Sequence, residues 1–356
     1  MMIKILFTGF KMKKRTLRHT DIQVSPLCMG TMTFGEQNTL AESHQIMDCA
    51  YDYGINFFDT AEMYPIPPNA LTHFRTEEFI GQWDKFKNHR DQIILATKII
   101  GPSSVMTYIR GGSKKIRDNI QEAITGSLRR LNTDYIDLYQ IHWPARPTNF
   151  FGQLDYKFPT NLVDDQITET NFALESLKQE GLIRAYGISN ETPWGMMKYQ
   201  EVSKINSLTG ISTIQNPYNL LNRSFEVGMA EICHREGIQL LPYSPLGFGV
   251  LTGKYIGQTA NENSRLLRWP DYKRYSNENA VKATKKYMQL AQDHGLSLTQ
   301  IALQFVTSRP FVLSNIIGAT TIPQLKENLD SIQLHLKEEI LRGIEQIHQE
   351  HPNPAP

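Results

Sequence analysis

Eight short apolar segments alternate with amphipathic segments of helical period along this chain. The apolar segments cover residues 25–30, 55–60, 93–100, 135–143, 183–190, 211–218, 238–246 and 315–320. The stretches between them, such as 116–131 and 279–295, repeat apolar residues every three or four positions. Strands joined by single helical crossovers run parallel. Eight such units predict a closed (β/α)8 TIM barrel of the α/β class, and an open doubly wound sheet is the alternative.

The predicted helices end at glycines. Gly54, Gly181, Gly237 and Gly295 each follow the last periodic residue of an amphipathic stretch. A left-handed C-cap favours glycine at this position because glycine has no Cβ. These residues therefore mark the C-terminal ends of four helices.

No linker or change in composition divides the chain. We therefore predict one domain over residues 14–356, preceded by an N-terminal extension over residues 1–13. Residues 16–25 alternate apolar and polar side chains around Thr20 and Asp21, which predicts a hairpin ahead of the first barrel strand.

Charge and cysteine content exclude several classes of protein. The 37 Lys and Arg residues nearly balance 36 Asp and Glu residues, so the strong positive field that nucleic-acid or anionic-membrane binding requires is absent. Cys28, Cys49 and Cys233 lie far apart without a CxxC pair, which argues against disulfides and a structural zinc site and favours a reducing, cytoplasmic location. Lys4 interrupts the apolar start, and no other stretch approaches 18 apolar residues, so we predict no membrane span. The sequence makes no prediction of the oligomeric state.

Two connections are longer than ordinary loops. One follows the fourth predicted strand over residues 144–165, and the other follows the seventh over residues 247–277. Loops that follow barrel strands gather at the C-terminal face, where ligands bind. Both loops are therefore expected to border one site.

Four polar residues stand at the C-terminal ends of three neighbouring predicted strands. Asp59 ends the second strand and Tyr64 follows it, Lys98 ends the third strand, and His142 ends the fourth. Each residue alone also fits a structural role in packing or capping, but together they suit a proton-donor site. A lysine ammonium beside a tyrosine stabilises phenolate and lowers its pKa from about 10, while an aspartate holds the lysine charged. His142 would then orient a substrate oxygen.

Eight motifs in the predicted strand order resemble those of the aldo-keto reductase family. They are GTMTFGEQN, NFFDTAEMYP, ATKI, QIHWPARPTNFFG, YGISNET, IQNPYNLLNRSFE, YSPLGFGVLTGKY and GATTIPQLKEN. The resemblance covers the chain from about Lys14 and is greatest to the Tas-type bacterial members, which are kin to the potassium-channel β subunits. It implies that Asp59, Tyr64, Lys98 and His142 are the family's catalytic tetrad, with Tyr64 as the general acid.

The resemblance also implies NADPH as the cofactor, bound across the barrel mouth. Ser189, Asn190 and Gln215 match residues that hold the nicotinamide carboxamide, and Tyr243 matches the aromatic residue on which the ring stacks. The residues expected to contact the cofactor are Gly30, Thr31, Ser189, Asn190, Gln215, Tyr243, Ser244, Leu246, Gly247, Gly249, Gly253, Lys254, Arg265, Thr320, Gln324, Glu327 and Asn328. Glycines in the loop after Ser244 allow backbone N–H groups to approach the pyrophosphate.

The adenosine end departs from the commoner family pattern. Many members place a lysine or arginine against the 2′-phosphate, where this chain has Gly318 and Gln324. Charge normally distinguishes a 2′-phosphate from a hydroxyl. We expect Lys254 and Arg265 to compensate, so that NADP(H) is preferred over NAD(H).

The substrate is a small carbonyl compound in this interpretation. The expected pocket residues are Met32, Met63, Trp143, Phe150, Phe151 and Trp269. Arg146 could contact an acidic substrate, but we favour the alternative that its side chain is solvated. The leading function is NADPH-dependent reduction of an aldehyde or ketone to an alcohol. The alternative is a cofactor-sensing regulatory subunit with residual reductase activity.

Overall fold

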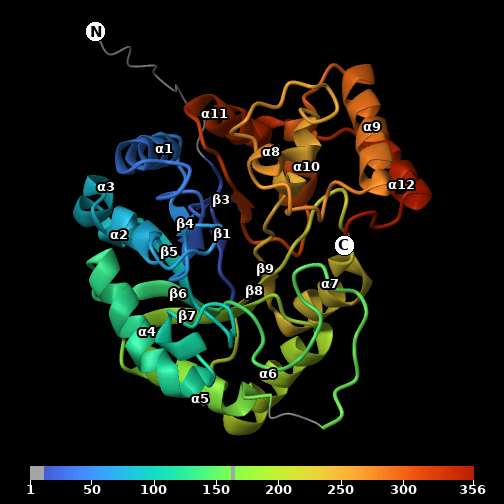
Figure 1. Cartoon of the computed structure of the whole chain (residues 1–356). Helices are drawn as coiled ribbons and strands as arrows, with labels where there is room; N and C mark the ends of the chain where they lie inside the picture. Colours follow the sequence, from blue (N-terminus) through green and yellow to red (C-terminus); the bar gives the residue numbers. More distant parts are fainter. Residues whose placement is uncertain (1–11, 162–164) are drawn as a thin grey trace.

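Eight parallel strands form the centre of the molecule. The computed structural model describes residues 12–161 and 165–356 (Figure 1). The strands follow the spatial order β10-β3-β4-β5-β6-β7-β8-β9, and every neighbouring pair is parallel. Their bounds are β3 Leu27–Gly30, β4 Phe57–Asp59, β5 Ile94–Ile99, β6 Ile136–Ile141, β7 Ile183–Ser189, β8 Thr213–Gln215, β9 Gln239–Leu240 and β10 Asn315–Ile317. Each strand lies within one of the eight apolar segments of the sequence.

Backbone hydrogen bonds join the first and last members of this order. The N–H of Leu240 in β9 donates to the carbonyl of Phe311 at 2.8 Å, and the N–H of Leu313 donates to the carbonyl of Leu240 at 2.8 Å. The N–H of Ile316 in β10 donates to the carbonyl of Pro242 at 3.1 Å. These bonds close the sheet, so the predicted (β/α)8 barrel is confirmed and the open doubly wound sheet is excluded.

Helices surround the barrel (Figure 1). Neighbouring helices are in contact from α1 through α2, α4, α5 and α6 to α7, and α11 contacts α1. The longer helices are α1 Leu40–Asp52, α2 Arg75–Gly81, α4 Ile116–Leu131, α5 Ile167–Gln179, α6 Pro193–Asn206, α7 Phe225–Glu236, α9 Glu278–Asp293, α10 Leu298–Thr307, α11 Ile322–Asp330 and α12 Glu338–Glu350. The short ones are α3 Asp84–Asn88, α8 Arg265–Arg268, η1 Arg90–Gln92, η2 Arg110–Gly112, η3 Gly247–Thr252 and η4 Ser331–Gln333. In the parts of the chain that the structure describes, no helix has the length and apolar character needed to cross a membrane.

The predicted helix stops are confirmed. Gly237 is the C-cap of α7 with a φ of +73°. Gly54, Gly181 and Gly295 also have positive φ, and each lies one residue beyond the C-cap of its helix. A residue with a Cβ is strained in this left-handed conformation.

The predicted hairpin is also confirmed, and it covers the N-terminal end of the barrel. Strands β1 (Arg15–Thr16) and β2 (Gln23–Val24) pair antiparallel. The hairpin residues Leu17 and Ile22 pack into the same apolar cluster as Phe57 and Leu138 of the barrel strands. Of the predicted extension, residues 1–11 lie outside the described residues, whereas Met12 is buried in the main core.

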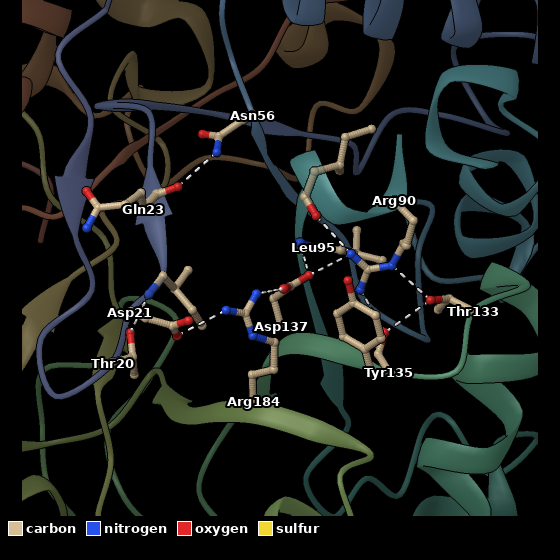
Figure 2. Close-up of polar contacts among 12 residues, drawn as sticks. Thr20, Asp21, Gln23, Asn56, Arg90, Leu95, Thr133, Tyr135, Asp137 and Arg184 are labelled. Atoms are coloured by element: carbon tan, nitrogen blue, oxygen red, sulfur yellow. Dashed lines mark hydrogen bonds and ion pairs between the residues drawn. The ribbon is translucent and has the colours of Figure 1, made fainter. Parts of the chain in front are cut away.

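A buried aspartate ties the hairpin to the barrel strands (Figure 2). Asp137 of β6 forms ion pairs with Arg184 at 2.7 Å and with Arg90 at 2.9 Å. It also accepts a hydrogen bond from the N–H of Leu95 at 3.0 Å. Arg184 reaches on to Asp21 of the hairpin at 3.1 Å. One carboxylate thus neutralises two arginines and fixes the closed end of the barrel.

Both long connections are confirmed. One lies between β6 and α5, and its residues 162–164 fall outside the described part of the chain. The other lies between β9 and α9 and contains η3 and α8. Because both follow strands, they leave the barrel at its C-terminal end, opposite the hairpin.

The Asp137 network generates a prediction about stability. Asp137→Asn should lower the free energy of unfolding by about 3 kcal/mol, because it removes the buried countercharge of two arginines. Glu231→Gln is the matched control, since it breaks an exposed pair with Arg235 and should cost about 0.5 kcal/mol or less. Urea denaturation followed by circular dichroism measures both. Equal midpoints for the two variants would contradict the structural role of Asp137.

Candidate active site

A large cavity opens at the C-terminal end of the barrel. It has a volume of about 1440 Å³ and is lined by strand ends from β3, β4 and β8 and by the loops after β6 and β9. Asp59, Tyr64 and His142 line it, while Lys98 is fully buried directly below. The structure therefore brings all four predicted catalytic residues to one place.

Asp59 and Lys98 form a buried ion pair inside the barrel. The Nζ of Lys98 lies 2.6 Å from Oδ2 of Asp59 and donates a second hydrogen bond, also of 2.6 Å, to the carbonyl oxygen of Thr60. The other oxygen of Asp59 accepts from the amides of Gln215 at 2.8 Å and Gln140 at 3.3 Å. Burial acts to lower the pKa of Lys98, but the charge and hydrogen bond of Asp59, together with the neighbouring Tyr64 and Cys28, outweigh burial and the pKa is raised. Lys98 is therefore held as an ammonium ion.

The Tyr64 ring lies above this ion pair, with Nζ of Lys98 5.0 Å from its centroid. Burial raises the pKa of the Tyr64 phenol, and Lys98 lowers it by a smaller amount. Lys98 therefore lowers the pKa of Tyr64, as predicted. The predicted net lowering is nevertheless wrong, because desolvation of the phenolate raises the pKa by a larger amount. Tyr64 is consequently a protonated phenol at neutral pH, as a proton donor must be.

His142 lies at the end of β6 beside Tyr64. The two ring centroids are 5.7 Å apart and the ring planes are nearly perpendicular, at 78°. Burial, together with the Lys98 charge, lowers the pKa of His142 well below its usual value. The imidazole is therefore neutral and presents one N–H donor and one acceptor. Its Nδ1 is buried and has no hydrogen-bond partner among residues 12–161 and 165–356.

The residues matched to the nicotinamide line the cavity beside the tetrad. The Oγ of Ser189 donates to the carbonyl of Gln215 at 2.7 Å, and the hydroxyl of Tyr243 donates to Oδ1 of Asn190 at 2.7 Å. The amide of Asn190 also donates to the carbonyl of His142 at 2.9 Å. These hydrogen bonds join β7, β8 and β9 at the level of the catalytic residues.

Gly30 and Thr31 line the cavity at the end of β3. The hydroxyl of Thr31 donates to the carbonyl oxygen of Asp59 at 2.9 Å. A Cβ on Gly30 would lie 2.8 Å from a side-chain carbon of Ile316, so only glycine fits between β3 and β10 here.

The loop after β9 contributes several cations to the cavity, and Lys254 and Arg265 are two of them. Ser244, Leu246, Gly249, Lys254 and Arg265 all line it. Burial lowers the pKa of Lys254, and the neighbouring charge of Arg265 lowers it further. No carboxylate in the described ranges forms an ion pair with either side chain. Two adjacent, uncompensated cations make this loop suitable for an anion.

Two glycines of this loop do not line the cavity, contrary to expectation. Gly247 and Gly253 both have positive φ. A Cβ on Gly247 would meet the Tyr275 ring, and a Cβ on Gly253 would meet Met288. These glycines allow η3 to turn against the helices behind it and do not contact the cavity.

The residues matched to the adenosine end line the cavity at the start of α11. Gln324 accepts hydrogen bonds from the N–H and hydroxyl of Thr320 at 3.0 and 3.1 Å. Glu327 accepts from Ser297 at 2.7 Å, and Asn328 donates to the carbonyl of Gly318 at 3.0 Å. None of these four residues has a basic side chain.

Five of the six expected substrate-pocket residues line the cavity. They are Met32, Met63, Trp143, Phe150 and Phe151. Trp143 packs between His142, at 5.0 Å between ring centroids, and Phe151, at 6.0 Å. Trp269 is the exception, because it packs against Tyr272 and Arg268 just beyond α8 and does not line the cavity.

Arg146 has neither of the roles considered from the sequence. It donates to Glu191 at 2.9 Å and to the hydroxyl of Thr192 at 3.0 Å, and only 10% of its side chain is exposed. The arginine therefore anchors the loop after β6 to the loop after β7. Its partner is 45 residues away in the sequence, so local pattern could not reveal it.

Sequence reasoning also missed a buried ion pair behind Tyr64. Glu62 lies between Asp59 and Tyr64, is fully buried, and accepts from Arg110 at 2.7 Å and from the N–H of Ile100 at 2.8 Å. The sequence signal for this ion pair is the acidic Glu62 within the apolar surroundings of the motif NFFDTAEMYP. Arg274, which lines the cavity, was missed as well.

The chain is similar to known proteins over most of its length. Residues 26–349 match the model of the aldo/keto reductase family. The chain is 46% identical to the tas protein of Escherichia coli over 97% of this chain and 100% of that protein. It is 32% identical to the oxidoreductase YrpG of Bacillus subtilis over 93% of this chain and 94% of that protein. It is also 29% identical to norsolorinic acid reductase A of Aspergillus parasiticus over 91% of this chain and 78% of that protein. The chain belongs to the aldo/keto reductase family.

Proposed function

We propose that this protein is an oxidoreductase that reduces an aldehyde or ketone to an alcohol with NADPH, and that Tyr64 is the general acid. The observation that carries this proposal is a tyrosine ring in the cavity, with the Lys98 ammonium of a buried ion pair with Asp59 5.0 Å from the ring centroid. The names of the Bacillus and Aspergillus relatives, an oxidoreductase and a reductase, support the same class of reaction.

The cavity fits a dinucleotide cofactor together with a small substrate. Its volume of about 1440 Å³ exceeds the range of roughly 300–1,000 Å³ usual for one small ligand. Ser189, Asn190, Gln215 and Tyr243 would hold the nicotinamide end, and Lys254 with Arg265 would neutralise phosphate. A bound NADPH would supply the hydride that adds to the carbonyl carbon.

The chain's own residues would manage the proton and the orientation of the carbonyl group. The Tyr64 hydroxyl would donate its proton to the carbonyl oxygen, and the neutral His142 would hold that oxygen by an N–H hydrogen bond. Lys98 would stabilise the phenolate left on Tyr64, and Asp59 would keep Lys98 charged and in place. The apolar wall of Trp143 and Phe151 would exclude water from the reacting carbon.

Two features support a small-molecule enzyme of the cytoplasm with no nucleic-acid partner. The net charge is +1, and the three cysteines are all free. A panel of simple aldehydes and ketones, assayed by cofactor absorbance with NADPH and NADH side by side, tests the reductase class. Tight cofactor binding with negligible turnover on every compound would favour the regulatory alternative instead.

Tyr64→Phe should reduce carbonyl turnover by ~10²- to 10⁴-fold, because it removes a positioned proton donor. Affinity for NADPH should be nearly unchanged, because the hydroxyl is not needed to hold the cofactor. Stopped-flow reduction of an aldehyde measures the first quantity, and fluorescence titration measures the second. A variant that keeps more than a tenth of wild-type single-turnover rate would show that Tyr64 is not the acid.

Lys98→Met should reduce turnover by at least about 10²-fold, the scale seen when a preorganised electrostatic group is lost. Because Lys98 lowers the pKa of Tyr64, its removal should raise that pKa further. Reduction requires protonated Tyr64, so the decline of residual activity at alkaline pH should move to higher pH. Lys98→Arg keeps the charge and is the control. A decline at the same pH in wild type and Lys98→Met would contradict the coupling.

Arg265→Ala should weaken NADPH by roughly ten- to a hundredfold, the range for a charge-assisted hydrogen bond. NADH should weaken less if Arg265 contacts the 2′-phosphate. Arg268→Ala is the matched control, because Arg268 lies on the same short helix but outside the cavity. Fluorescence titration with both cofactors decides the question. Equal losses would assign Arg265 to the pyrophosphate, and tighter wild-type binding of NADH would refute the NADP(H) preference.

A further inference from the structure

Arg274 is a cation of the cavity that the tetrad and the cofactor residues leave without a role. It lies in the connection between α8 and α9, is partly buried and lines the cavity. Burial acts to lower its pKa, but the phenols of Tyr243 and Tyr275 outweigh this effect and raise it. The guanidinium is therefore firmly charged and lies beside Tyr243, at the nicotinamide end of the cavity.

Arg274 has no countercharge within residues 12–161 and 165–356. Several other arginines that are shielded from water are paired with carboxylates: Arg110 with Glu62, Arg146 with Glu191, and Arg223 with Glu226. A partly desolvated charge without a partner costs free energy, and an anion that enters the cavity would recover it. Arg274, like Arg265, is therefore an unpaired arginine at a place that a ligand can reach.

The position of Arg274 favours the substrate over the cofactor as the source of that anion. A Cβ on Gly152 would lie 2.8 Å from Nε of Arg274, so the arginine abuts the loop after β6. This loop carries Phe151, which packs on Trp143, which in turn packs on His142. Lys254 and Arg265 lie close to each other, since the charge of Arg265 lowers the pKa of Lys254.

We propose that Arg274 binds a carboxylate on the substrate, and that the physiological substrates are aldehydes or ketones carrying a carboxylate at the end remote from the carbonyl. The inference rests on the proposed reductase function and names its substrate class. The carbonyl oxygen lies at Tyr64 and His142, the apolar body lies along Trp143 and Phe151, and the carboxylate forms a two-point contact with the guanidinium. The carboxylate is unchanged by the reaction.

Kinetics with a matched pair of aldehydes test the proposal. Wild type should turn over 4-carboxybenzaldehyde with a higher kcat/KM than 4-methylbenzaldehyde. Arg274→Gln should lower kcat/KM for the carboxylated aldehyde by roughly ten- to a hundredfold, mainly through KM, because a charge-assisted contact is lost. The neutral aldehyde should be unaffected. Arg274→Lys should recover part of the preference, and Lys273→Gln, which removes the adjacent exposed cation of the same cavity, should retain all of it.

A binding measurement separates this proposal from the proposed function. Calorimetry of 4-(hydroxymethyl)benzoate with the NADP-saturated protein reports the anion site without turnover, and Arg274→Gln should abolish most of that affinity. If neither aldehyde is reduced but this loss is seen, the reductase proposal fails and the anion site stands. If both aldehydes are reduced equally well by wild type and Arg274→Gln, the anion site is refuted and the reductase stands. A loss of NADPH affinity in Arg274→Gln would assign the arginine to a cofactor phosphate and also overturn the proposal.

Discussion

The buried pair of Lys98 and Asp59 is the interaction on which the site depends. Both side chains lie inside the barrel, with exposed fractions of 0% and 3%, where an unpaired charge would be prohibitive. Their remaining hydrogen-bonding capacity is satisfied by the carbonyl of Thr60 and by the amides of Gln140 and Gln215. Four strands, β4, β5, β6 and β8, therefore contribute to one polar layer, and the geometry of that layer positions Tyr64 above it.

This polar layer divides the barrel into two ends with different roles. Below it the interior is apolar, with Cys28, Phe57 and Leu138 packed against the hairpin. At the closed end, Asp137 neutralises Arg90 and Arg184, so these three charges are paired within the protein (Figure 2). At the open end, Lys254, Arg265 and Arg274 have no protein carboxylate among the described residues. The paired charges of the closed end stabilise the fold, whereas these three cations of the open end remain available to ligands.

The strands and the tetrad could be predicted because their signals are local and repetitive. Each strand is a short apolar run between helical stretches, and parallel strands bring their C-terminal residues to the same mouth. The sequence therefore predicts that Asp59, Lys98 and His142 meet at this mouth. The pKa of Tyr64 was not predictable in the same way, because its net direction depends on how far packing removes water from the phenol.

The loops resisted prediction because their conformations depend on partners remote in the sequence. Arg146 is fixed by Glu191, and Gly247 by its approach to Tyr275, neither of which follows from residue type and spacing alone. The same dependence explains how a common barrel can serve different substrates. The tetrad is held by strands and their buried hydrogen bonds, whereas Gly152 and Arg274 meet only because two long loops converge over the mouth. Changes in either loop can therefore alter which substrate is held while the proton-donating layer beneath stays the same.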